Sequence, residues 1–308
     1  MDGHQPLERG VVVCSGKGGV GKSSVAAGLA GTAAAMGWRT LAVDLDPQGN
    51  LGQDLGYLQN GQSDHGEALA SAYELDAIVE PLRGVRDGLD VVPGGGYTDR
   101  LVEILRHRVE QVGVEALLQF RRLLVGLGQG YDLVVVDTPP STRDLLDAAL
   151  ASVRFVMVPV RFDRGSIDGV ERVSDRYRAV RDAGLNPDLE LLGIALFGFA
   201  TTERRMLADT RAELEAELDG VAPVFDRYIR EAKKAARHMR EHGVIASEYL
   251  LAAREALPWY EAEAGAETFA RNAAGLAEDY WELTREILQR LTDRVAPTVD
   301  LRERETVA

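Results

Sequence analysis

The sequence predicts an α/β fold in which a mostly parallel, twisted sheet carries helices on both faces and is followed by a helical C-terminal extension. Strand-like apolar runs alternate with helix-like stretches up to His242, which is typical of a parallel sheet joined by crossover helices. Two of these runs, at 133–136 and 155–158, are continuously apolar, as expected for central strands covered on both faces. Beyond His242 only helical periodicity remains, which indicates the extension.

The order of the elements follows from this alternation. Strands are expected at residues 10–15, 40–44, 89–93, 133–137, 155–160 and 191–197. Helices are expected at residues 22–36, 98–108, 114–127, 143–150, 166–182, 203–218 and 227–242. The clearest surface loop spans residues 59–66, where glycine and polar residues replace apolar ones.

The chain is expected to divide into a domain at residues 1–246 and a helical extension at 247–308, whose polar end, 297–308, should fray. The extension carries apolar residues at spacings of three and four, which places them on one helix face. This stripe consists of Phe269, Ala273, Leu276, Tyr280, Leu283, Ile287 and Leu291. Such a stripe usually packs back on its own domain, and a partner or dimer surface is the alternative.

Composition restricts the class of protein. The 308 residues are 45% hydrophobic and 27% charged, as in an ordinary globular protein, and no apolar run approaches the roughly 20 residues that span a bilayer. The N-terminus has neither the basic region nor the apolar core of a signal peptide. A single cysteine, Cys14, excludes an internal disulfide and a two-cysteine metal site within one chain. These features indicate a cytoplasmic protein without a membrane partner.

Residues 16–23 read GKGGVGKS and satisfy the G-x-x-x-x-G-K-[ST] pattern of a phosphate-binding loop. An apolar β-branched run precedes them and a helical pattern follows, which is the context that the chemistry requires. Glycines let backbone N–H groups fold around an anion at the positive end of a helix. Lys22 would then reach the β- and γ-phosphates, and the Ser23 hydroxyl would bind Mg²⁺. The motif therefore specifies the fold as the P-loop NTPase type.

Two aspartate-containing segments follow later strands. Asp44 opens DLDPQGN at the end of the second strand, so that Asp44 and Asp46 lie on the same side of an extended backbone and face the same crevice as the loop. The plainer interpretation is a turn with residues chosen for backbone reasons. Asp137 ends a hydrophobic strand, a position where a carboxylate holds Mg²⁺ directly or through water. An aspartate there is weak evidence by itself, but the three segments in this order are specific.

Together these segments resemble the ParA/MinD family of deviant Walker-motif ATPases. The resemblance lies in KGGVGKSS at 17–24, DLDPQGN at 44–50 and DTPPS at 137–141. The early lysine, Lys17, separates this family from ordinary P-loop NTPases, and the second and third segments look more like the ParA partition branch than the MinD branch. The resemblance implies that the protein binds ATP and Mg²⁺ and hydrolyses ATP.

The resemblance also implies a role for each matching residue. Lys17 would reach across a nucleotide-sandwich homodimer to the partner's phosphates, Lys22 would hold phosphate, and Asp46 would orient the attacking water. The metal would be surrounded by Ser23, Asp44 and Asp137. The nucleotide would be bound by Gly16, Lys17, Gly18, Gly19, Val20, Gly21, Lys22, Ser23 and Ser24, the last near the α-phosphate.

A basic stretch stands out against a net charge of −14. Between Arg227 and His242 there are six Lys/Arg and two acids. Partition ATPases of this kind bind nonspecific DNA as ATP dimers through basic residues late in the domain, so the resemblance implies the same for a face of this predicted helix. The DNA-binding residues would be Arg230, Lys233, Lys234 and Arg237. A solvated amphipathic helix is the alternative.

The expected function is that of a ParA-type ATPase. It would dimerise on ATP, bind nonspecific DNA on the nucleoid, and hydrolyse ATP slowly under stimulation by a ParB-like centromere-binding partner, so as to partition plasmid or chromosomal DNA. The alternative is a MinD-like or orphan ParA-like ATPase that positions a protein cargo. Iron–sulfur relatives need cysteines beyond the switch aspartates, which this sequence lacks, and a small-molecule ligase on this fold has no positive signature here.

Overall fold

The computed structural model describes residues 5–140, 142–161, 164–218, 223–256, 269–270 and 272–295. Two expectations lie outside the described residues: Ser141 of the DTPPS segment and the frayed end at 297–308. Within the described ranges, no helix combines the length and the apolar character that crossing a membrane requires.

A sheet of eight strands forms the centre of the described part of the chain, in the order β3-β4-β2-β5-β1-β6-β7-β8. Neighbouring strands are parallel except β3 and β4, which pair antiparallel at one edge. The strands are β1 Leu7–Val13, β2 Thr40–Asp44, β3 Leu82–Arg86, β4 Leu89–Val92, β5 Leu133–Asp137, β6 Val153–Arg161, β7 Glu190–Phe199 and β8 Val224–Arg230. The predicted fold class is confirmed.

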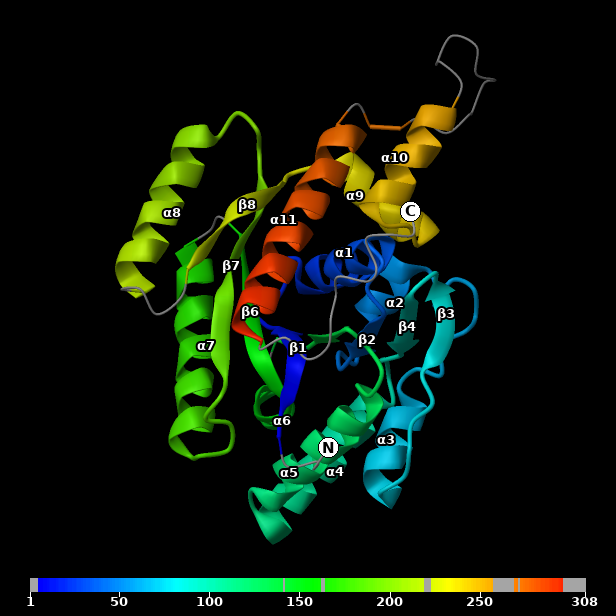
Figure 1. Cartoon of the computed structure of the whole chain (residues 1–308), viewed down its shortest axis with the longest axis vertical. Helices are drawn as coiled ribbons and strands as arrows, with labels where there is room; N and C mark the ends of the chain where they lie inside the picture. Colours follow the sequence, from blue (N-terminus) through cyan, green and yellow to red (C-terminus); the bar gives the residue numbers. More distant parts are fainter. Residues whose placement is uncertain are drawn as a thin grey trace.

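Helices cover both faces of this sheet (Figure 1). They are α1 Lys22–Ala35, α2 Asn50–Leu55, α3 Glu67–Leu75, α4 Thr98–Val112, α5 Glu115–Leu127, α6 Arg143–Ser152, α7 Arg164–Asp182, α8 Arg204–Leu218, α9 Lys233–His242, α10 Ala246–Glu255 and α11 Ala273–Arg294. One buried cluster takes its helical residues from α3 to α8, and the other takes them from α1, α2 and α9 to α11. The two clusters lie on opposite faces of the sheet.

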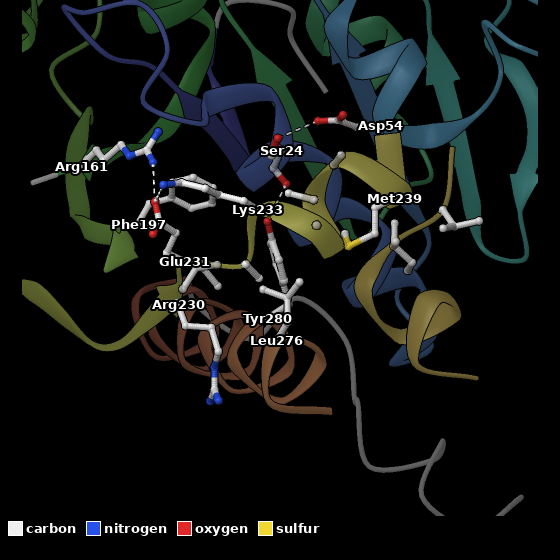
Figure 2. Close-up of a pocket in the computed structure, with 18 residues that line it drawn as sticks. Ser24, Asp54, Arg161, Phe197, Arg230, Glu231, Lys233, Met239, Leu276 and Tyr280 are labelled. Atoms are coloured by element: carbon white, nitrogen blue, oxygen red, sulfur yellow. Dashed lines mark hydrogen bonds and ion pairs between the residues drawn. The ribbon is translucent and has the colours of Figure 1, made fainter. Parts of the chain in front are cut away.

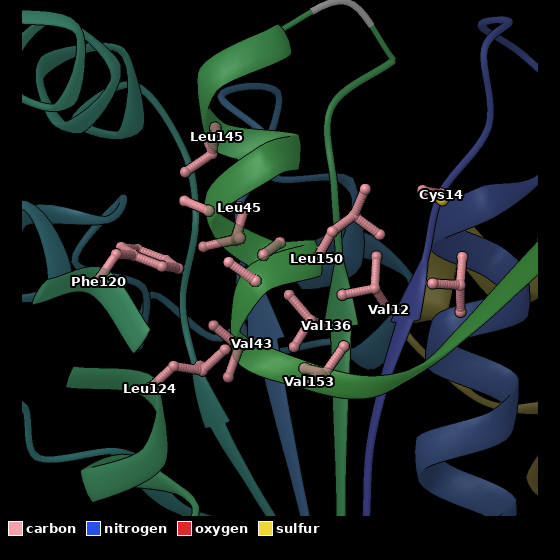
Figure 3. Close-up of a cluster of buried hydrophobic side chains, with 14 of the residues drawn as sticks. Val12, Cys14, Val43, Leu45, Phe120, Leu124, Val136, Leu145, Leu150 and Val153 are labelled. Atoms are coloured by element: carbon pink, nitrogen blue, oxygen red, sulfur yellow. The ribbon is translucent and has the colours of Figure 1, made fainter. Parts of the chain in front are cut away.

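Alternate residues of β1 show how the two clusters share one sheet. Val12 belongs to the cluster on the α3–α8 face and Val11 and Val13 to the other, and all three are fully buried. Figure 3 shows the first cluster, where the strand valines meet Phe120 and Leu124 of α5. Burying each such side chain stabilises the fold by about 1.5–3 kcal/mol. The strand β1, which leads into the site, is therefore buried on both faces of the sheet.

The helix expected at 227–242 is wrong in its first part. Residues Val224–Arg230 form the edge strand β8, which runs parallel to β7, and α9 begins only at Lys233. The segment VFDRYIR is rich in aromatic and β-branched residues, and Phe225 and Ile229 are buried in the cluster on the α1 face. The basic residues of this segment favour a helix face, but the burial of its apolar residues at the sheet edge makes it a strand. The short elements β3, α2 and α3 were not expected either.

The C-terminal helix α11 packs on α1 and β8, on the face that carries the α1 cluster (Figure 1). Six members of the predicted apolar stripe are buried there: Ala273, Leu276, Tyr280, Leu283, Ile287 and Leu291. The ring of Tyr280 lies so close to Gly28 of α1 that a Cβ added at Gly28 would be 2.2 Å from it. Only glycine permits this approach, so α11 is fitted closely against the helix that follows the phosphate loop.

Candidate functional site

The carboxyl ends of β1, β2 and β5 meet at one edge of the sheet. In the parallel register, Asp137 of β5 pairs with Val13 of β1 on one side and with Asp44 of β2 on the other. The loop after β1 and the two aspartate segments therefore emerge side by side, in the crevice where open parallel sheets bind their ligands. The three motifs, far apart in sequence, form one site.

The loop between β1 and α1 is shaped by its glycines. Gly19 and Gly21 have φ of +77° and +87°, a conformation that other residues rarely adopt. A Cβ on Gly16 would lie 2.5 Å from the carbonyl oxygen of Gly169 in α7, whereas one on Gly18 would meet nothing within 4 Å. The loop is thus tightly packed at its start and open in its middle, at the N-terminus of α1 where anions bind.

A pocket of about 880 Å³, called the loop pocket below, opens beside this segment. Predicted site residues that line it are Gly18, Gly19, Gly21, Lys22, Ser23, Ser24 and Asp46. Lys22 and Ser23 are largely buried, with exposed fractions of 6% and 8%. Lys17 does not line the loop pocket, and its Cβ lies beside Gly169 of α7. Gly16 and Val20 shape the loop without lining the pocket, and Val20 is buried.

Three carboxylates lie at the base of the site. Asp44 and Asp137 are fully buried, and Asp46 has an exposed fraction of only 5%. The N–H of Asp46 donates to Asp44 Oδ1 at 2.9 Å, and Asp46 Oδ1 accepts from the N–H of Gln48 at 2.9 Å. Burial, reinforced by the charge of Asp137, raises the pKa of Asp44 well above its ordinary value. Burial also raises the pKa of Asp137 to about 7, and the Ser23 hydroxyl and the Lys22 charge oppose that rise.

The buried oxygens fit a hard cation such as Mg²⁺. Among the described residues, Asp44 Oδ2 and both oxygens of Asp137 lack a hydrogen-bond partner of good geometry, although Ser23 is near enough to affect Asp137. No group of three or more His, Cys, Asp or Glu side chains with metal-site geometry occurs in the described ranges. Mg²⁺ is commonly held by one or two carboxylates together with substrate phosphates, so two carboxylates and the Ser23 hydroxyl are a sufficient protein contribution.

A second pocket of about 300 Å³, called the side pocket below, adjoins the loop pocket (Figure 2). Ser24, Phe197 and Ala236 line both pockets. The Phe197 ring packs on the phosphate loop, since a Cβ on Gly21 would lie 2.5 Å from it. No sequence pattern marks the side pocket, because its walls come from α1, α2, α9, α11 and three strands.

The predicted DNA-binding residues are only partly brought together. Lys233, Lys234 and Arg237 are exposed in the first half of α9. Arg230 lies on β8 instead of the helix, which corrects the predicted four-residue face. Arg230 lines the side pocket, but its Nε donates to Asp279 of α11 at 2.6 Å, and its guanidinium lies apart from the other labelled side chains (Figure 2).

Comparison with known proteins supports one family. The AAA domain family model, AAA_31, matches residues 8–191, more than half of the chain. The chain is 37% identical over 186 residues to the chromosome-partitioning ATPase Soj of Thermus thermophilus. The aligned residues cover 60% of this chain and 68% of Soj. The chain belongs to the ParA/MinD family of ATPases. It is also 34% identical over 199 residues to the chromosome partitioning protein ParA of Myxococcus xanthus, and these residues cover 64% of this chain and 67% of that protein.

Solved structures show a similar fold over nearly the whole chain. The fold seen here matches that of apo McdA of Cyanothece with a TM-score of 0.70 at 17% identity, and the match covers 91% of this chain and 99% of that one. A putative plasmid partition protein of Borrelia burgdorferi bound to AMPPNP matches with a TM-score of 0.62 at 18% identity, covering 93% and 99%. The ParA/MinD assignment makes the protein an ATPase, as predicted from the three motifs.

Proposed function

We propose that this protein is a ParA-type switch that binds ATP and Mg²⁺, closes into a nucleotide-sandwich homodimer, binds nonspecific DNA in that state, and releases it on hydrolysis. In this proposal a ParB-like centromere-binding partner stimulates hydrolysis, and the cargo is plasmid or chromosomal DNA carried on the nucleoid. The supporting observation is that Lys22, Ser23 and Asp46 line one pocket at the N-terminus of α1.

Each residue has a distinct part in this chemistry. Phosphoryl transfer depends mainly on positioning and on stabilisation of charge, which the loop N–H groups and Lys22 supply to the phosphates. Bound Mg²⁺ would neutralise the β- and γ-oxygens, and Ser23, Asp44 and Asp137 would hold it. Asp46, the most accessible of the three carboxylates and the only one that lines the loop pocket, would orient the attacking water.

The side pocket is the proposed seat of the adenine base. It begins at Ser24, the residue assigned to the α-phosphate, so a nucleotide with its phosphates in the loop pocket reaches it directly. Its walls include Phe197, Ile229 and Leu276, which offer apolar surface to a base. The extension therefore contributes to nucleotide binding through α11.

Dimerisation is proposed to depend on Lys17. Because Lys17 does not line the loop pocket of its own chain, a role toward the phosphates of a second subunit agrees with its position. Two subunits joined in this way would separate when the γ-phosphate is lost, so that ATP controls the state of the protein.

DNA binding is proposed for the exposed cations of α9. Lys233, Lys234 and Arg237 lie within five residues of one another on a chain whose net charge is −14. A dimer doubles this local positive charge and can release several counterions from DNA, which predicts steep salt dependence. Arg230 is left out because its guanidinium is held by Asp279.

The experiment that tests the proposal is sedimentation of the full chain with nonspecific duplex DNA over a salt series, in Mg-ATP and in Mg-ADP. The proposal expects binding in ATP alone, falling steeply as salt rises. Lys22→Ala serves as the control that should bind in neither nucleotide. Binding in neither nucleotide by a wild-type protein that still dimerises on ATP would reject the DNA cargo. It would favour the alternative of a MinD-like or orphan ParA-like ATPase with a protein cargo.

A further inference from the structure

Three polar side chains link the phosphate loop to α9. The Ser24 hydroxyl donates to Asp54 Oδ2 at 2.8 Å, a bond drawn in Figure 2. Arg240 donates to the same carboxylate, from Nε to Oδ1 at 2.8 Å and from Nη2 to Oδ2 at 3.3 Å. Ser24 is in α1, Asp54 in α2 and Arg240 in α9, so the chain of contacts joins three separate elements. None of the three nucleotide-binding segments includes Asp54 or Arg240, although Arg240 belongs to the basic stretch between Arg227 and His242.

These contacts lie within the proposed nucleotide site. Arg240 lines the loop pocket together with Lys22 and Ser23, and Asp54 lines the side pocket. The Asp54 side chain is only 10% exposed, so its charge is poorly solvated, and Arg240 pairs with it from a more open position. A buried carboxylate one hydrogen bond from Ser24 repels phosphate and competes for the Ser24 proton, because an ionised carboxylate can only accept.

The position of α9 does not depend on the Arg240 side chain alone. The backbones of Gly56 and Gly243 touch so closely that a Cβ on Gly243 would lie 2.1 Å from Gly56 Cα. Gln59 Nε2 donates to the Arg240 carbonyl oxygen at 2.9 Å, and Arg86 Nη2 donates to the Gly243 carbonyl oxygen at 2.9 Å. Because these contacts keep α9 against α2, the Arg240 guanidinium has a separate effect, which is to balance the charge of Asp54.

We infer that Arg240 is a positioning residue for nucleotide binding. By pairing with Asp54 it cancels the negative charge beside Ser24 and lets the Ser24 hydroxyl turn from the carboxylate to a phosphate. The inference rests on the proposed ATP binding and adds to it a requirement that comes from α9. Loss of the Arg240 charge should therefore weaken nucleotide binding only while Asp54 is charged.

The test is a double-mutant cycle in the full chain. The dissociation constant for a fluorescent ATP analogue with Mg²⁺ is measured for the wild type, Arg240→Met, Asp54→Asn and the double variant. Arg240→Met is expected to bind at least tenfold more weakly, because an uncompensated carboxylate then faces the phosphates. Asp54→Asn still offers Ser24 an acceptor and is expected to bind as tightly as the wild type or more tightly. The double variant is expected to return to within about threefold of the wild type.

Two further variants separate charge from packing. Arg240→Lys keeps the charge and should recover most of the affinity that Arg240→Met loses. Arg178→Met removes an arginine that pairs on the surface of α7 with Asp175, both side chains being well exposed, and should leave the affinity unchanged. Thermal melts of each variant show whether it folds.

Several outcomes would overturn the inference. One is that Arg240→Met binds the analogue within threefold of the wild type. Another is that the double variant binds as weakly as Arg240→Met, which would mean that the pair of Arg240 and Asp54 has a structural role only. If Arg240→Met does not fold, a tenfold loss in folded Asp54→Asn has the same consequence. Failure of the wild type itself to bind the analogue would overturn the proposed function, and this inference with it.

Discussion

Lys17 and Lys22 belong to one loop and yet have different surroundings. Lys22 is buried and lines the loop pocket, whereas Lys17 is half-buried, lies beside Gly169 of α7 and does not line that pocket. The two lysines therefore differ in position as the proposal requires, with Lys22 assigned to the nucleotide of its own subunit and Lys17 to that of a second subunit. Asp46 differs from its neighbour Asp44 in the same way, because only Asp46 lines the loop pocket. These differences lead to two predictions about single residues.

Lys17→Ala is expected to abolish ATP-induced dimerisation while ATP binding persists, because Lys22 and the loop N–H groups remain. Light scattering after gel filtration in Mg-ATP measures the mass, and a fluorescent analogue measures binding. Arg178→Ala, an exposed cation of α7, is the matched control and should still dimerise. A Lys17→Ala protein that forms the dimer normally would contradict the trans role.

Asp46→Ala is expected to bind ATP and to lose hydrolysis, by about 10² to 10⁴-fold if it orients and activates the water. Phosphate release and analogue binding are measured on the same preparation. Asp64→Ala removes a loop carboxylate that caps the turn before α3, outside both pockets, and should retain turnover. Full turnover by Asp46→Ala would assign the water-orienting role to another group.

At the scale of the element, α9 contacts the protein interior on one side and solvent on the other. Its buried Ala235 packs into the α1 cluster, its Arg240 reaches Asp54, and Lys233, Lys234 and Arg237 are exposed. Arg237 and Lys233 have acidic neighbours, Glu241 at 2.7 Å and Glu231 at 3.2 Å. Exposed pairs of this kind contribute little to stability, so these cations can exchange their partners for DNA phosphates at small cost.

Reversal of two α9 charges, Lys233→Glu with Arg237→Glu, is expected to weaken DNA binding in ATP at least tenfold. Because Lys233 lines the side pocket and Arg237 lines the loop pocket, ATP-driven dimerisation is measured on the same protein. Lys234→Glu, at a residue that lines neither pocket, should weaken DNA binding and spare ATP-driven dimerisation. The reason is that phosphate contacts from basic residues dominate nonspecific affinity. Sedimentation with duplex DNA measures the effect. Arg122→Glu with Arg178→Glu makes the same change in net charge on the opposite helix layer, in α5 and α7, and should bind normally. Unimpaired binding by the α9 variant would exclude this helix as the DNA surface.

At the scale of the whole molecule, the C-terminal helix is part of the core that supports the site. Helix α11 covers β8 and α1, its Tyr280 lies over Gly28, and both Leu276 and Tyr280 line the side pocket. The Tyr280 hydroxyl also lies 3.4 Å from the carbonyl oxygen of Ser24. The division of the chain at residue 246 stays a prediction, but the packing of α11 implies that it unfolds together with the sheet.

Leu283→Ala in α11 is expected to lower the free energy of unfolding by about 2–5 kcal/mol, because it leaves a cavity between α11 and the sheet. Urea denaturation of the ligand-free protein measures this loss. Arg285→Ala changes a residue on the exposed side of the same helix, where its guanidinium pairs with nearby Glu282, and should alter stability by less than about 0.5 kcal/mol. Equal stability of wild type and Leu283→Ala would mean that α11 is not part of the cooperative unit.

The prediction from sequence was accurate where periodicity and motif agreed. The central strands at 40–44 and 133–137 match β2 and β5, because buried parallel strands are continuously apolar and have few alternatives. The prediction is wrong at 227–230, which belong to the strand β8 and not to the start of a basic helix. Because an edge strand is half exposed, its composition does not distinguish it from a helix. Only its pairing with β7 identifies the segment as a strand.

By itself the sequence determined the fold class, the phosphate loop and the three aspartates, because these depend on local patterns: glycines that allow positive φ, and carboxylates placed at the ends of apolar strands. The tertiary structure alone decided which cations pair with acids of distant elements, since Arg230 and Arg240 pair with Asp279 and Asp54. It alone formed the side pocket, whose walls come from strands and helices across the whole chain. Charge partners and cavity walls are non-local, and no spacing in the sequence encodes them.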